Sequence, residues 1–187
     1  MENLTTTPFS MVYDSFLSKI TDDMFMELNE LDTFRILQDL LVSAVHKFEF
    51  PRVNLNDYEL SYIEDEDTYE GIESDDSEVK AFIYNGGYFN NLLTAEEINI
   101  ISTYMVVEWL GQQLASVENT RMKYSGSDFK FTSQANHMAK IQTRKKEYER
   151  EGFHLQRLYK RRFVDEKGHV RSTMNMIMEE YIHDDSE

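Results

Sequence analysis

The feature that most constrains this chain is one long helical pattern, LTAEEINIISTYMVVEWLGQQLASVEN, which runs from Leu93 to Asn119. Thr94 and Glu97 form a capping box at its start, because the threonine hydroxyl can accept an early backbone N–H and the glutamate can reach back to the cap. Apolar side chains then recur at helical spacing: Ile98, Ile101, Met105, Trp109, Leu110, Leu114 and Val117. This broad stripe predicts a helix packed in the core, with an intersubunit face as the alternative.

Two further helices are predicted before this one. Pro8 favours a helix start, and residues 9–20 offer Phe16, Leu17 and Ile20 to the core. Asp32 is a candidate cap for a second helix, and Pro51 is expected to end it. The apolar side chains of that second helix recur at steps of three and four: Phe34, Leu37, Leu41, Val45 and Phe48.

A fourth helix is predicted after the polar joint YSGSDFKFTSQANH, residues 124–137. Ser133 precedes a new periodic run and is interpreted as a helix N-cap. The helix is expected to run toward Gly152, with one face formed by Ala135, Met138, Ile141 and Tyr148. The joint has no GxxxxGK[ST] pattern, and Ser133 with His137 lacks a GxSxG elbow and an orienting acid, so neither a phosphate loop nor a nucleophile is predicted.

Three short segments favour strands. Residues 53–63 alternate weakly, and residues 81–89, AFIYNGGYF, suggest a hairpin that turns at Asn85 and Gly86, or an aromatic loop packed on a helix. Residues 162–172, RFVDEKGHVRS, suggest a C-terminal hairpin or an extended arm. With only two prolines and seven glycines in 187 residues, long helices are favoured over a turn-rich sandwich.

We therefore expect a mainly α fold, a helical bundle with a small β-hairpin or loop insertion and a C-terminal extended arm. The expected helical core domain spans residues 1–152, with an acidic loop and possible hairpin inserted at 53–91. Residues 153–187 are expected to be an arm or hairpin that docks on a partner. Cysteine is absent, which excludes disulfides and thiolate-bound zinc.

Charge is distributed unevenly along the chain. The formal net charge is −16, yet residues 64–78 hold nine acidic and no basic side chains, and residues 140–162 hold nine basic and three acidic ones. Such asymmetry is typical of interaction surfaces, although a solvated loop and a solvated helix face are the alternatives. An acidic protein repels DNA phosphates, which suits a surface that DNA passes without sticking.

No catalytic, metal or cofactor site is predicted, so we expect no enzyme. The five histidines do not match a metal-binding spacing, and the acidic loop does not fit an EF-hand. The N-terminus, MENLTTTPFS, lacks the pattern of a signal peptide, and no apolar stretch reaches the roughly 18 residues of a membrane span. We therefore expect a protein made in a cytoplasm that does not bind a membrane.

The C-terminal segment is predicted to bind a partner, because methionine-rich apolar surface adapts to other proteins. A short helix that returns to its own core is the alternative. The candidate partner-binding residues are Arg161, Arg162, Phe163, Val164, Val170, Met174, Met176, Ile177, Met178 and Tyr181.

The stretch GYFNNLLTAEEINIISTYMVVEWLGQQL, followed by SGSDFKFTSQANHMAKI, resembles the head–tail connector, or adaptor, proteins of tailed bacteriophages. The resemblance covers residues 87–141 and carries no residue of known chemistry. It implies a structural virion protein that forms a ring, commonly of about twelve copies, beneath the portal. Such a ring extends the DNA channel and gives the tail or a stopper protein its platform, at the head–tail junction of the virion. DNA would pass through the channel without specific binding.

Two other hypotheses stay open from the residues. One is a cytoplasmic regulatory or interaction protein that binds nucleic acid or an acidic partner through the basic helix 140–162. The other is an enzyme that binds a divalent metal on the acidic loop.

Overall fold

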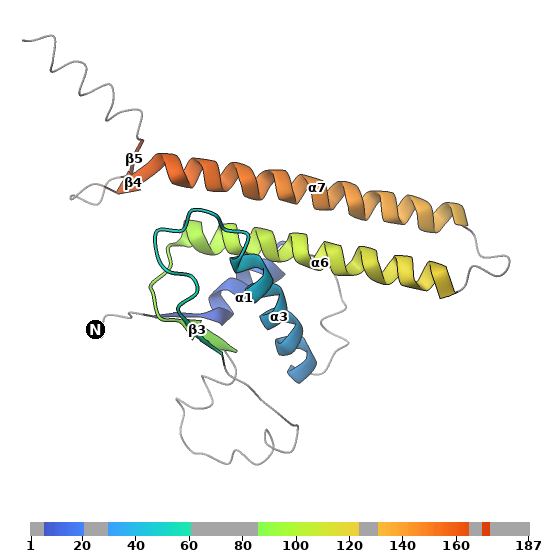
Figure 1. Cartoon of the computed structure of the whole chain (residues 1–187), viewed down its shortest axis with the longest axis horizontal. Helices are drawn as coiled ribbons and strands as arrows, with labels where there is room; N and C mark the ends of the chain where they lie inside the picture. Colours follow the sequence, from blue (N-terminus) through green and yellow to red (C-terminus); the bar gives the residue numbers. More distant parts are fainter. Residues whose placement is uncertain (1–5, 21–29, 61–85, 124–130, 165–169, 173–187) are drawn as a thin grey trace, which may run out of the picture.

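The computed structural model describes residues 6–20, 30–60, 86–123, 131–164 and 170–172, and Figure 1 shows how they are arranged. Helices dominate the described chain: α1 (Phe9–Leu17), α3 (Glu30–Val45), α6 (Ala95–Lys123) and α7 (Phe131–Arg161). Five short strands form two small antiparallel sheets among these residues. The predicted mainly α fold with a small β component is confirmed.

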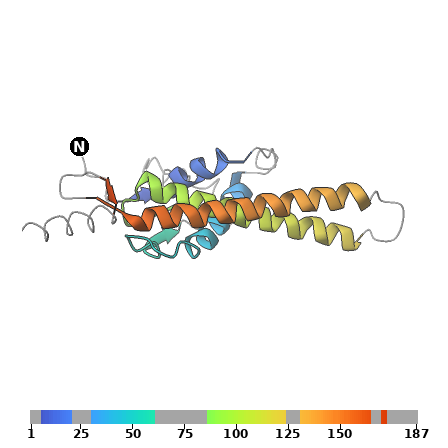
Figure 2. The ribbon, with the colours of Figure 1, turned by 90° about the horizontal axis from the view of Figure 1, so that it is seen from above.

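Helix α6 forms the centre of the fold. Helices α1 and α3 pack on one side of its N-terminal half, and α7 runs antiparallel along the other side, as Figures 1 and 2 show. As a result, α6 is buried nearly all round between Ile98 and Leu110, which is the pattern of an interior helix. Beyond this region α6 and α7 continue together as a long helical hairpin that projects from the body.

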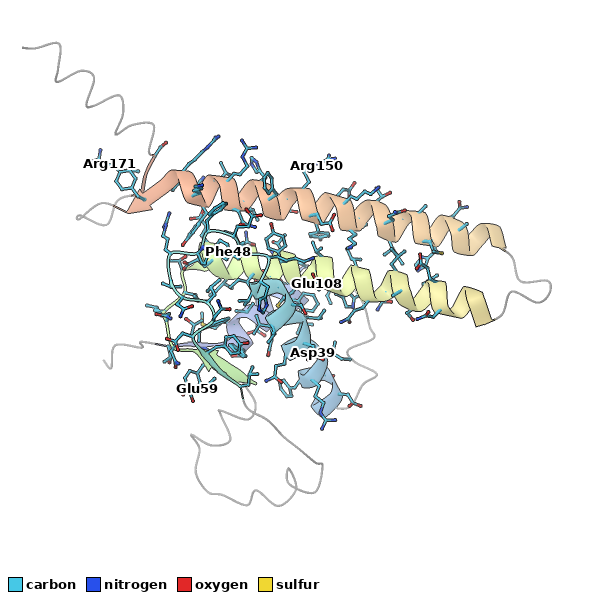
Figure 3. The ribbon with its side chains drawn as sticks, in the orientation of Figure 1. Asp39, Phe48, Glu59, Glu108, Arg150 and Arg171 are labelled. Carbon is cyan, nitrogen blue, oxygen red and sulfur yellow. The ribbon has the colours of Figure 1, made fainter. Side chains whose placement is uncertain are left out.

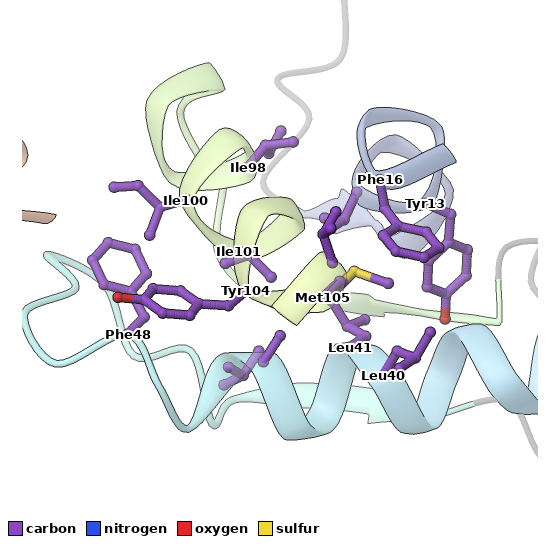
Figure 4. Packing of buried hydrophobic residues seen from close by; sticks show 14 of the residues in the cluster. Tyr13, Phe16, Leu40, Leu41, Phe48, Ile98, Ile100, Ile101, Tyr104 and Met105 are labelled. Atoms are coloured by element: carbon purple, nitrogen blue, oxygen red, sulfur yellow. The ribbon is translucent and has the colours of Figure 1, made fainter. Parts of the chain in front are cut away.

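The core lies where α1, α3 and α6 meet. Met105 is fully buried against α1 and α3, and Phe16, Leu40 and Leu41 surround it, as Figure 4 shows. Burial of such side chains contributes about 1.5–3 kcal/mol each relative to exposure. The core residues predicted from helical spacing are therefore confirmed, except that Leu17 is exposed and five others are only half-buried: Ile20, Phe34, Trp109, Leu114 and Val117.

Helix α7 packs on α6 through a seam with alternating steps of three and four, the spacing of a coiled coil. The seam of α7 comprises Met138, Ile141, Lys145, Tyr148, Gly152, Leu155 and Tyr159, most of them half-buried or buried. Three contacts repeat every seven residues along both helices: Glu97 with Tyr159, Tyr104 with Gly152, and Gly111 with Lys145. This regular register sets which residues of α7 face outward.

Four predicted helix limits are wrong. Helix α3 begins at Glu30 and α7 at Phe131, so Asp32 and Ser133 lie inside the first turns and are not caps. Helix α3 also ends at Val45, before Pro51, and α7 continues past Gly152 to Arg161. Packing of α7 against α6 outweighs the modest cost of about 1 kcal/mol for a glycine within a helix.

The larger sheet has the strand order β1-β3-β2, with β1 at Thr7–Pro8, β2 at Tyr58–Leu60 and β3 at Gly87–Phe89. Strand β2 confirms the strand predicted within residues 53–63. Strand β3 pairs with β1 on one edge and with β2 on the other, so no edge is left for the strand before Asn85 and the predicted hairpin at Asn85 and Gly86 is wrong. Residues 81–85 themselves lie outside the described residues. The acidic segment 64–78 also lies outside them.

The second sheet is a C-terminal hairpin of β4 (Arg162–Val164) and β5 (Val170–Ser172), which confirms the hairpin alternative. Residues 153–161, expected in an arm, instead belong to α7 and place Gln156 and Tyr159 in the interior. The division into a core and an arm otherwise stays a prediction. None of the helices described here has both the length and the apolarity that a membrane span requires.

Candidate partner-binding surface

The candidate surface lies at one end of the molecule, where the C-terminal part of α7 meets the β4–β5 hairpin and the loop of residues 46–57. The loop contacts α7 through Gln156, which is only 2% exposed. The Glu49 backbone N–H donates to Gln156 Oε1 at 2.8 Å, and Gln156 Nε2 donates to the Lys47 carbonyl at 2.9 Å and to the Tyr104 hydroxyl at 2.5 Å. Gln156 therefore fixes the loop against α7 from both sides.

Arg52 ties the same loop to the end of α7. Its guanidinium lies 4.0 Å from the centre of the Tyr159 ring and donates to the backbone carbonyls of Tyr159, at 2.9 Å, and Arg162. Arg162 in turn forms an ion pair with Glu96 at 3.0 Å. These contacts hold the first residue of β4 in place, which matters because an isolated two-stranded hairpin is only marginally stable.

A buried hydrogen-bond network lies beneath this end. Glu97 is 1% exposed, and its carboxylate accepts the Tyr159 hydroxyl at 2.5 Å and the Thr94 backbone N–H and hydroxyl, each at 2.8 Å. The Glu97 N–H donates back to Thr94 Oγ1 at 3.3 Å, so the predicted capping box is confirmed. Burial raises the pKa of Tyr159, and the hydrogen bond to the Glu97 carboxylate raises it further.

The outward side of this end carries two exposed aromatic rings, each beside a cation. Phe50 is 42% exposed with Lys160 Nζ 4.0 Å from its ring centre, and Phe153 is 51% exposed with Arg157 Cζ at 5.9 Å. Phe153, Arg157 and Lys160 share one helix face because they follow at steps of four and three. We call these four residues the aromatic–basic patch.

Charge is divided unevenly between the C-terminal part of α7 and the rest of the chain. Residues 140–162 carry +6, from nine basic and three acidic side chains, so the rest of the chain carries −22. All of these basic residues except Lys145 are exposed. Figure 3 places Arg150 on the outer side of α7, whereas the exposed Asp39 and Glu59 lie on the side away from α7.

No protein-family model, curated protein or solved structure matches this chain. What the surface does must therefore be argued from its chemistry.

The surface offers binding chemistry. In the part of the chain that the structure describes, no three histidine or carboxylate side chains gather as a group that could hold a metal ion. Among the exposed side chains of α7 outside the seam, the basic side chains and Phe153 can bind carboxylates, phosphates and planar groups. This end of α7 can therefore bind an anionic partner.

The structure brings five of the predicted partner-binding residues together. Arg161 ends α7, Arg162, Phe163 and Val164 form β4, and Val170 pairs with Val164 from β5. The remaining predicted residues lie outside the described part of the chain: Met174, Met176, Ile177, Met178 and Tyr181.

Sequence reasoning missed Phe50, Arg52, Phe153 and Gln156. The heptad spacing of α7 could have found Phe153, because it falls outside the seam and is an exposed aromatic among basic residues. No local signal predicts Phe50, because its position depends on contacts with residues more than 100 positions away.

Proposed function

We propose that this protein is a structural subunit of the head–tail connector of a tailed bacteriophage. It assembles as a ring beneath the portal, extends the DNA channel and provides the platform for the tail or a stopper protein. In this proposal the ring belongs to the virion, and subunits are made in the host cytoplasm. The resemblance of residues 87–141 supports the choice of this family.

The observation that carries the proposal is the exposed basic surface of α7 in a chain that is otherwise strongly acidic. A basic α7 surface in an acidic chain favours contact between unlike surfaces of successive copies, rather than between two identical basic faces. Head-to-tail contacts of this kind close into rings when the rotation between copies allows it. Complementary charge also selects the correct register between neighbours.

The shape of the subunit supports the same role. The projecting α6–α7 hairpin gives the small body a rigid extension, and the β4–β5 hairpin lies at the opposite end of α7. A subunit with attachment points at both ends can contact a neighbour, the portal and a tail component at the same time. The net charge of −16 suits a wall that DNA passes without binding.

The proposal is tested by mixing the purified full chain with purified portal complexes and measuring mass by native mass spectrometry. We expect a ring of this protein on the portal. Reversal of charge at Arg150 and Arg157 should weaken ring formation, because both are exposed basic residues of α7. Reversal at the acidic residues Glu147 and Glu151 is the matched control, and it should not weaken the ring. A chain that stays monomeric and ignores the portal would rule the proposal out.

A second candidate function is favoured by the exposed basic residues of α7, which could bind nucleic acid or an acidic regulatory partner. Binding of a DNA fragment would then weaken steeply with salt and would be lost on Lys146→Glu with Arg150→Glu. Ring formation on the portal that persists without any DNA binding would decide for the connector.

A further inference from the structure

We infer that the aromatic–basic patch of one copy binds the acidic segment, residues 64–78, of a neighbouring copy. This deepens the proposed function, because it names one contact between successive subunits. It would also hold for any assembly of this chain in which copies meet head to tail.

The patch is held rigid from below. Gln156 and Arg52 fix the loop that carries Phe50, and the seam with α6 fixes the face of α7 that carries Phe153, Arg157 and Lys160. Both rings are nevertheless about half exposed. A surface with its side chains already in place loses little conformational entropy when a partner binds, which favours affinity.

The chemistry of the patch fits one segment of this chain. Residues 64–78 carry nine carboxylates and no basic residue, together with Tyr69 and Ile72. Arg157 and Lys160 can bind the carboxylates. Phe50 and Phe153 offer apolar surface to Tyr69 and Ile72 of the segment. The exposed Arg150 and Arg161 extend the positive charge along the same side of α7.

The attachment points of the segment lie on the side of α6 away from the α7 patch. The segment follows β2, which ends at Leu60, and precedes β3, which begins at Gly87. Figure 1 places β3, and with it its paired strand β2, on the side of α6 away from α7. In a head-to-tail arrangement that side of one copy faces the α7 surface of the next.

The first experiment measures binding of a fluorescent peptide of residues 62–79 to the full chain by anisotropy. The full chain carries Asn or Gln at the nine acidic positions of 64–78, so that its own segment does not compete. We expect saturable binding that weakens at least tenfold between 50 and 300 mM salt, as an order-of-magnitude expectation for several charge contacts. Absence of saturable binding would overturn the inference.

Matched variants locate the binding site. Arg157→Glu with Lys160→Glu should weaken binding at least about tenfold, and Phe50→Ala with Phe153→Ala at least about threefold, because charge and apolar area both contribute. Lys140→Glu with Arg144→Glu reverses the same number of charges on the same helix away from the patch and should change binding less than about twofold. An equal loss in this control would show diffuse attraction along α7 and overturn the inference. So would tighter binding of an oligothymidine of equal charge at the patch.

The second experiment tests whether the acidic segment binds the patch of another copy, rather than the patch of its own chain, by complementation between two variants. One variant keeps the patch and has the neutralised segment, and the other keeps the segment and has Arg157→Glu with Lys160→Glu. Each alone should stay monomeric, whereas an equimolar mixture should form a one-to-one complex in sedimentation velocity. No complex in the mixture would overturn the inference. If the wild-type chain then still forms a ring on the portal, the connector role stands. Only the proposed contact between the patch and the acidic segment is ruled out.

Discussion

Gly152 of α7 lies directly against the Tyr104 ring of α6, and this contact sets how closely the two long helices approach. A methyl group at position 152 would lie 2.8 Å from Tyr104 Cζ and 3.0 Å from Cε1. The ring has little room to move, because it is buried and its hydroxyl accepts a hydrogen bond from Gln156. We expect Gly152→Ala to destabilise the fold by about 1–2 kcal/mol, since overpacking outweighs the gain in helix propensity.

Gly111, on the same seam, provides the control. A methyl group there would meet only the Lys145 side chain, at 3.6 Å from Cε. Gly111→Ala should therefore stabilise the protein by about 0.5–1 kcal/mol through helix propensity alone. Urea unfolding of both variants measures whether each change lowers or raises the free energy of unfolding. A more stable Gly152→Ala variant would contradict the close contact.

Gln156 is expected to be required for the loop that carries Phe50. Gln156→Met keeps a similar volume but leaves the Glu49 N–H and the Lys47 carbonyl without their partner. We expect a loss of about 1–3 kcal/mol in the free energy of unfolding and faster hydrogen exchange of the Glu49 amide. Gln142→Met, at an exposed site of the same helix, should change stability by less than about 0.5 kcal/mol.

The stability of the fold should decrease in alkaline solution partly because of Tyr159. Burial and the hydrogen bond to Glu97 raise its pKa above the ordinary value of about 10. The unfolded chain therefore loses this proton at a lower pH than the folded protein does. The stabilisation is complete below about pH 10 and is lost as the pH rises further.

Tyr159→Phe separates this contribution from the rest. At neutral pH it should cost about 1–2 kcal/mol, because the Glu97 carboxylate loses one donor but keeps Thr94. Above about pH 10 its stability should fall less steeply with pH than that of the wild type. Urea unfolding at several pH values measures how steeply the free energy of unfolding falls with pH in the wild type and in the variant. Identical slopes would show that Tyr159 does not contribute to the loss of stability in alkali.

Gly87 is expected to tolerate no side chain. Its φ is +125°, and a Cβ would lie 2.1 Å from the Glu59 carbonyl oxygen of the neighbouring strand. Gly87→Ala should cost at least about 2 kcal/mol, through backbone strain and loss of the β2–β3 pairing, and should lower the Tm. Gly86→Asn is the milder control, because asparagine tolerates its φ of +69°. Equal losses in the two variants would contradict this reason.

The sequence alone determined the helical character of this protein and the main core positions. Capping residues and apolar spacing act over a few residues, so Thr94 with Glu97 and the stripe of α6 could be predicted from local chemistry. Helix ends were less certain, because propensity at Asp32, Ser133 and Gly152 is weak compared with packing.

Only the tertiary structure decided which residues form the candidate surface. Phe50 meets Lys160, and Arg52 meets Tyr159, only because the register between α6 and α7 brings the end of α7 beside the loop after α3. The basic surface of α7 likewise depends on how α7 packs on α6, since the run of charges in the sequence does not show which of its residues face outward. Contacts between distant residues depend on the sum of many packing interactions, and no short pattern encodes that sum.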